Sequence, residues 1–175
     1  MINVQSWQQD YEAAAQGAQS WVQGTPAVML APWHFQLHWQ AKDYHEKGQY
    51  QLAVILSQAA CDLHIEAALS ELMRPLGDER LVKLALRALR RPVSLASLDV
   101  RRIWAELTGE RPAGHIKLKV APAPWWNEWE RARALRHAVV HDGRKPSAEE
   151  SQTALVASQQ YFDHMLVVLR RGPVK

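Results

Sequence analysis

Apolar residues recur along most of the chain at the spacing of α-helices. Residues 42–74 predict one long helix, bent near Gly48, and its second half is apolar over more than half of its circumference. A helix of this kind packs on several sides, so we expect it at the centre of the fold, with Leu63 buried. Its remaining polar groups recur at intervals of four and form one stripe, Gln58, Asp62 and Glu66.

The amino-terminal residues predict a separate segment. Residues 3–23 are rich in Gln and Ala and favour a first helix, which Gly24 and a following proline close. Residues 25–35 carry two prolines around a short apolar run and therefore predict an irregular connection. We accordingly divide the chain into residues 1–41, a helix with its connection, and residues 42–171, a helical bundle.

The carboxyl-terminal half predicts further helices, at residues 78–90, 97–108, 125–141 and 147–171. The last one has the clearest start signal, because Ser147 followed by Glu150 matches a capping box. Residues 115–120 (HIKLKV) are compatible with a short strand, although no partner strand is evident. The predicted fold is all-α, a bundle of four core helices plus an amino-terminal helix.

Composition and charge narrow the class of protein. The chain has 175 residues, 47% apolar and 22% charged, which is typical of a single soluble globular domain. Cys61 is the sole cysteine, so no intramolecular disulfide can form, and a reducing compartment fits. The first residues lack the pattern of a signal peptide, and no apolar run approaches the roughly 20 residues of a membrane span. We expect a cytosolic protein, and the pI near 9.2 suits a nucleic-acid partner without requiring one.

The strongest candidate for chemistry is the segment RHAVVH, from Arg136 to His141. Histidine moves protons near neutral pH, and arginine holds phosphate oxygens, so the pair suits phosphodiester cleavage. Positions five apart differ by roughly 140° around an α-helix. For the two residues to act together, we expect the helix to end between them or a second subunit to complete the cleft.

Other interpretations of this segment stay open. His141 can serve only as a favourable cation at a helix carboxyl end, while Arg136 makes a surface ion pair. His137 and His141 share a helix face and suit a metal, but the glutamate of the HExxH pattern is missing, since Ala138 follows His137. With no convincing third ligand, we expect neither a metal nor another cofactor.

Basic and aromatic residues elsewhere are weaker signals. A stripe on the predicted helix 78–90 can follow a phosphate backbone or can be an ordinary solvated face; it comprises Arg80, Lys83, Arg87, Arg90 and Arg91. Arg133, Arg144 and Lys145 are further candidate RNA contacts near the RHAVVH segment. Most of the eight tryptophans suit packing, although Trp125 and Trp126 beside a proline-rich loop are expected to be partly exposed. Asp62 and Glu66 need partners, for which basic groups of the helix containing Arg136 are suitable.

The chain resembles the HEPN superfamily of helical domains, found in prokaryotic toxin–antitoxin, abortive-infection and antiphage systems. The family pattern is an arginine, four to six residues and a histidine, which Arg136 and His141 match, with the polar His137 in between. LRHAVVHDGRKPSAEES is similar to the stretch where an arginine helix ends and the final helix begins. HEKGQYQLAVILSQAACDLHIEAALSELM is similar to the long first core helix, where Asp62 or Glu66 can stand for a common acidic residue. The similarity covers roughly residues 42–171.

The resemblance implies a metal-independent endoribonuclease in which two chains bring two Arg–His sets into one cleft. The ribose 2′-hydroxyl would attack its own phosphate, with His141 in proton transfer and Arg136 stabilising the charged phosphorane. RNA, a second copy of the chain, and an antitoxin or sensor protein are the implied partners, and a membrane is not. Gly143 replaces the tyrosine that one toxin subgroup has two residues after the histidine, so the chain does not fit that subgroup. The alternative is a non-catalytic module that uses the same groove to bind RNA, a nucleotide or a protein.

Overall fold

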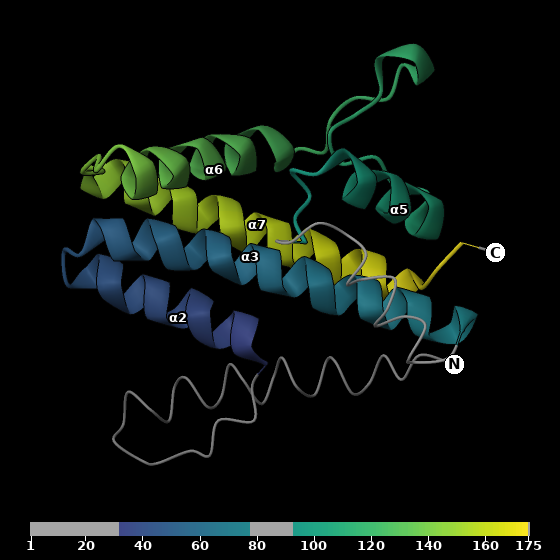
Figure 1. Ribbon diagram of the computed structural model, residues 1–175, viewed down its shortest axis with the longest axis horizontal. Helices are drawn as coiled ribbons and strands as arrows, with labels where there is room; N and C mark the ends of the chain where they lie inside the picture. The colour runs from purple at the N-terminus through teal and green to yellow at the C-terminus, as the bar shows by residue number, and fades with distance from the viewer. Residues whose placement is uncertain (1–31, 78–92, 175) are drawn as a thin grey trace.

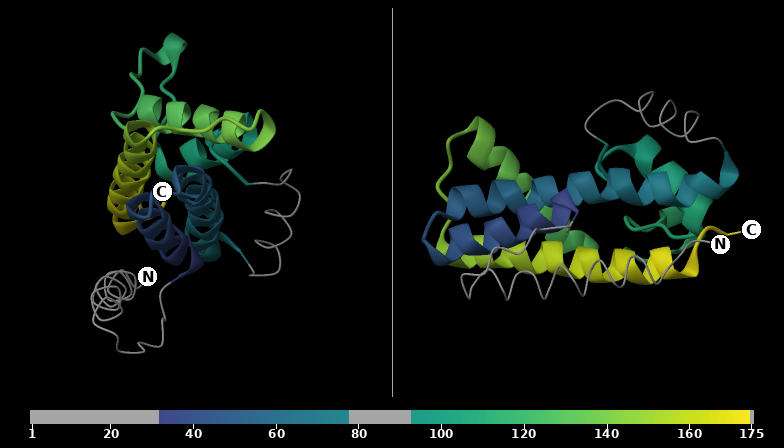
Figure 2. Two further views of the ribbon diagram at one scale, coloured as in Figure 1. Left: turned by 90° about the vertical axis from the view of Figure 1, so that its left-hand side faces the viewer. Right: turned by 90° about the horizontal axis from the view of Figure 1, so that it is seen from below.

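The protein is all-α, as the periodicity predicts. The computed structural model describes residues 32–77 and 93–174. The helices in these ranges form a bundle (Figure 1) and comprise α2 (Trp33–Glu46), α3 (Tyr50–Met73), α5 (Leu98–Thr108), α6 (Trp126–His141) and α7 (Ala148–Arg171). α3 lies at the centre of the bundle and contacts each of the other four helices. The views along and beneath the bundle place α6 on one side of the α3–α7 pair and α2 on the other (Figure 2). The predicted helices at residues 3–23 and 78–90 lie outside the described residues.

The segment before α3 differs from the prediction. α2 begins at Trp33, so the irregular connection expected over residues 25–35 does not extend to its predicted end. The division proposed after residue 41 therefore falls within a helix. The expected single helix over residues 42–74 is wrong, because two helices occupy this range and pack side by side. Gly48 separates them with a φ of 74°, a left-handed conformation that side chains disfavour. The backbone N–H groups of Gly48 and Gln49 return to carbonyls of α2 and end that helix.

α5 lies at one end of the bundle, and the segment that follows it projects away from the bundle there (Figure 1). α5 begins and ends where the pattern predicts, with Gly109 at its carboxyl end. Residues 115–120 are not a strand of a sheet, which corrects that interpretation. They form a 3-10 turn over Ile116–Leu118, closed by a single antiparallel bridge between His115 and Val120. The turn holds Ile116 almost fully in solvent, at 97% exposure.

The predicted capping box at the start of α7 is confirmed. The Ser147 hydroxyl accepts from the Glu150 N–H at 3.1 Å, and the Glu150 carboxylate accepts from the Ser147 N–H at 2.9 Å. Two backbone donors that the first helical turn leaves free are thereby satisfied. Glu150 also pairs with Arg144 in the connection from α6, which ties the end of one helix to the start of the next.

Aromatic and histidine side chains fill the core between α2, α3 and α7. His34, Phe35, His64, Tyr161 and Phe162 are all buried and in ring contact. The Tyr161 hydroxyl donates to the Cys61 carbonyl at 3.2 Å, so its oxygen is left to accept from His64 Nδ1, also at 3.2 Å. This arrangement holds His64 as the neutral tautomer with its proton on Nδ1.

Three side chains differ from the exposure that the sequence predicts. Trp125 and Trp126 are buried, at 3% and 6% exposure, so the expectation of partial exposure is wrong. Leu63 is 43% exposed, so the expectation that it is buried is wrong as well. The reason is that α3 is apolar on nearly every side, and its sequence cannot show which side its neighbours leave open.

Although polar residues interrupt its apolar sequence, α3 is long and apolar enough to span a membrane by length and composition. Its most apolar window has a mean hydropathy of 1.4, and 56% of that window is buried against other parts of the bundle. A central helix of a folded domain meets the same criterion for length and composition, so the feature is weak evidence for a membrane. No other helix of the described ranges meets the criterion.

Candidate functional site

A hollow of about 280 Å³ lies between α3, α6 and the segment before α5. From α3 and that segment it is lined by Gln58, Asp62, Ser94, Ala96 and Ser97. From α6 it is lined by Arg133, Arg136, His137, Val140 and His141. Both residues of the arginine–histidine motif therefore line one hollow, together with the acidic residue that the sequence singled out.

The segment before α5 forms one wall because its backbone is fixed. Val93 and Leu95 are buried and anchor it, and the Ser97 N–H bonds the Ser94 carbonyl at 2.9 Å. The Arg101 guanidinium donates to the carbonyls of Leu95 and Ala96, at 3.0 and 3.1 Å. The hydroxyls of Ser94 and Ser97 thus stand on a stable turn opposite α6.

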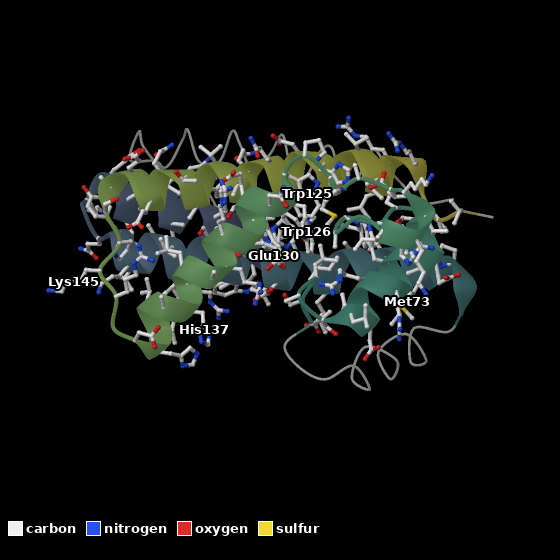
Figure 3. The ribbon with its side chains drawn as sticks, turned by 90° about the horizontal axis from the view of Figure 1, so that it is seen from above. Met73, Trp125, Trp126, Glu130, His137 and Lys145 are labelled. Atoms are coloured by element: carbon white, nitrogen blue, oxygen red, sulfur yellow. The ribbon has the colours of Figure 1, made fainter. Side chains whose placement is uncertain are left out.

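The basic wall comes from the last two turns of α6. This helix continues without a break from Trp126 to His141, so the expected end between Arg136 and His141 does not occur. Long side chains on adjacent faces of one helix nevertheless border the same hollow. His137 and His141 lie on one face with ring centroids 4.3 Å apart. Figure 3 shows His137 near the carboxyl end of α6, on the side away from α7.

The acidic side chain of the hollow is paired across it. Arg136 Nη1 lies 3.8 Å from Asp62 Oδ2, an ion pair too long for a hydrogen bond. Burial raises the pKa of the Asp62 carboxyl above its ordinary value. A hydrogen bond from the Ser94 side chain and the positive charges of Arg136 and Arg133 act in the opposite direction. The expectation that α6 supplies the partner of this carboxylate is confirmed for Asp62.

Two buried N–H groups of the lining side chains lack a partner among the described residues. Gln58 is only 2% exposed, and its Nε2 makes no hydrogen bond. Arg136 Nε is buried and likewise makes none. A buried donor without an acceptor costs about 1–3 kcal/mol, and beside a hollow a water molecule or a ligand can satisfy it.

Some candidate residues do not line this hollow. Glu66 continues the α3 stripe but is not among its lining residues. Arg144 pairs with Glu150 and borders a separate groove between α6 and α7. Lys145 is exposed in the connection between these helices, away from His137 (Figure 3). Arg133 lines the hollow but also bonds Glu130 at 2.8 Å. The stripe on the predicted helix 78–90 lies outside the described residues, and so do all of its members, Arg80, Lys83, Arg87, Arg90 and Arg91.

The His137–His141 pair has no third metal ligand in the part of the chain that the structure describes. No group of three histidine, cysteine, aspartate or glutamate side chains is placed there to hold an ion. A zinc site needs at least three such protein ligands, so these residues do not form one among themselves.

Sequence reasoning did not name three polar lining residues as part of the site. Gln58 had a signal, because it shares the i, i+4 stripe of Asp62. Ser94 and Ser97 had none, since only the folded chain brings the turn before α5 next to α6. Comparison with protein-family models, curated proteins and solved structures finds no match for this chain. The interpretation of the site therefore depends on its residues and their geometry.

Proposed function

We propose that this protein is a metal-independent endoribonuclease of the HEPN type, acting in the cytoplasm as a toxin or antiphage effector. The observation that supports the proposal is that Arg136, His137 and His141 line one hollow opposite Asp62. A proton-transfer group and a cation beside a cavity are what cleavage by the ribose 2′-hydroxyl requires.

Each residue has a distinct role in the proposed reaction. His141 transfers the proton that leaves the 2′-hydroxyl or joins the departing 5′-oxygen. Arg136 stabilises the charge that develops on the phosphorane, and Asp62, 3.8 Å away, helps to orient the guanidinium. The products are a 2′,3′-cyclic phosphate and a 5′-hydroxyl, so no external water is consumed in this step.

The test is digestion of a mixed-sequence RNA by the purified chain in excess EDTA. We expect cleavage to continue and the upstream fragments to carry 2′,3′-cyclic phosphate ends. Activity that EDTA abolishes and zinc restores would instead assign His137 and His141 to a metal. Binding of RNA without cleavage by the wild-type protein would favour the alternative, a non-catalytic binding module.

A second copy of the chain is part of the proposal. Val140 borders the hollow and is 50% exposed, so an apolar side chain lies in solvent beside the basic wall. Pairing through α6 would cover it and bring two Arg136–His141 sets together. We expect light scattering at micromolar concentration to give twice the mass of the chain, 19.9 kDa. A strictly monomeric mass would contradict the shared cleft.

A further inference from the structure

The floor of the hollow carries an amide and a carboxylate from one helix. Gln58 and Asp62 are four residues apart on α3, so their side chains are neighbours on one face. Gln58 presents a buried Nε2 donor without an acceptor among the described residues. The Asp62 carboxylate takes a side-chain hydrogen bond from Ser94, and Arg136 is too distant for one, so further lone pairs of its oxygens stay open to a ligand. The floor therefore offers one donor next to a strong acceptor.

The charges of the hollow are arranged unevenly between its floor and its mouth. Asp62 is 19% exposed and lies on the floor, where a phosphate would meet a like charge in a poorly hydrated place. His137 and His141 are exposed at the mouth, next to Arg136. An anionic phosphate fits the mouth, whereas the floor suits a neutral group that both donates and accepts hydrogen bonds.

We propose that the floor binds a guanine base, with the adjoining phosphate at Arg136 and His141. Guanine N1–H and N2–H are adjacent donors that a carboxylate accepts together, here the carboxylate of Asp62. Guanine O6 lies beside them and accepts from Gln58 Nε2. Adenine presents an acceptor at N1 and a donor at N6, so it opposes both side chains. The inference rests on the proposed function only in taking RNA as the source of the base. A nuclease with this site would cleave RNA selectively at guanosine.

The experiment titrates three nucleotides into the full chain by calorimetry: guanosine, inosine and adenosine 3′-monophosphate. Inosine keeps O6 and N1–H but lacks the 2-amino group, so the difference between guanosine and inosine reports the second bond to Asp62. A hydrogen bond to a charged group corresponds to about tenfold or more in affinity. We expect guanosine 3′-monophosphate to bind about tenfold more tightly than the inosine nucleotide, and the adenosine nucleotide to bind most weakly.

Two variants assign the contacts to their side chains. Asp62→Asn has nearly the same shape and should remove the difference between the guanosine and inosine nucleotides. Gln58→Leu should weaken both of these nucleotides alike, because both carry O6, and should not weaken the adenosine nucleotide. Asp99→Asn is the matched control, since Asp99 is an exposed carboxylate on α5 outside the hollow. If Gln58→Leu does not fold, Asp62→Asn with the inosine nucleotide tests the proposal alone.

Three results would overturn the proposal: no binding, equal affinity for the three nucleotides, or guanosine selectivity that Asp62→Asn leaves intact. Its failure is distinguishable from failure of the nuclease assignment, because nucleotide binding is measured without cleavage. Selective binding of guanosine by a protein that cuts no RNA would support the base site and reject the nuclease. Cleavage of RNA at all four bases, with unselective nucleotide binding, would support the nuclease and reject the base site.

Discussion

Histidines gather in two regions on different sides of α3, and their surroundings differ. In the core, His34, His38 and His64 are buried among aromatic rings. At the hollow, His137 and His141 are exposed on α6. The same residue type thus serves packing in one region and stands open to solvent in the other.

The difference shows why burial, rather than residue type, decides which histidines can transfer protons. Burial lowers the pKa of His34 and of His38 to about 4, because a charged imidazole loses its hydration there. Burial lowers the pKa of His64 as well, to well below its ordinary value. These three side chains remain neutral at physiological pH and have no access to RNA. Of the five histidines in these two regions, only His137 and His141 are accessible from solvent.

The largest expected effect is on cleavage at the hollow. Arg136→Ala and His141→Ala should each lower the rate by on the order of 10²–10⁴, the range for a positioned acid–base group or a charge-stabilising donor. His137→Ala should reduce the rate less than His141→Ala. Single-turnover cleavage of a labelled RNA measures all three.

Arg131→Ala is the control for this series. Arg131 is an exposed arginine of α6 that bonds Glu128 and borders the other groove. It should keep wild-type activity, and the melting temperatures of all the variants should stay close to that of the wild type. Wild-type cleavage in both Arg136→Ala and His141→Ala would reject the nuclease assignment at this hollow.

Substitutions in the core region should affect stability instead of chemistry. Ile65 is 1% exposed, so Ile65→Ala should lower the free energy of unfolding by roughly 2–5 kcal/mol. Leu63→Ala, two residues away on the same helix but 43% exposed, should cost less than about 1 kcal/mol. Urea unfolding monitored by tryptophan fluorescence compares the two. An equal loss in both variants would show that the outer side of α3 is covered in solution.

The last expected effect is a dependence of stability on pH that comes from the core histidines. The pKa of His34 and of His38 is about 4 in the folded protein and near 6.5 in the unfolded chain. Between these values the unfolded chain binds more protons, so the free energy of unfolding falls as the pH is lowered. The slope is about 1.4 kcal/mol per pH unit for each histidine. Urea unfolding at several pH values measures it, and His38→Gln should lower the slope. An unchanged slope in that variant would contradict the assignment to His38.

Local rules account for the parts that the sequence predicts correctly. The spacing of apolar residues locates α5, α6 and α7, and the Ser147–Glu150 capping box places the start of α7. The i, i+4 stripe on α3 correctly groups Gln58 with Asp62, and the need to partner a half-buried carboxylate correctly points to α6. These features depend on neighbours along the chain or on elementary electrostatics.

The errors arise where contacts between distant residues decide the structure. Gly48 permits either a bend or a full turn, and only the packing of α2 on α3 selects the turn. The exposure of Leu63 depends on which side of α3 the other helices cover. The turn at Ser94 reaches the hollow because Arg101 and buried neighbours fix its backbone, a contact that no local pattern in the sequence indicates.

α3 contributes side chains both to the hollow and to the core, which should limit how this protein can be re-engineered. Asp62 borders the hollow while His64, two residues later, lies in the aromatic core. In a library of random substitutions, selection for function should deplete changes on both of these faces, and Leu52 and Leu63 on its exposed surface should tolerate many replacements. Under the proposed function, new substrate preferences are therefore easier to evolve at Ser97, which lines the hollow but belongs neither to the proposed catalytic set nor to the buried core.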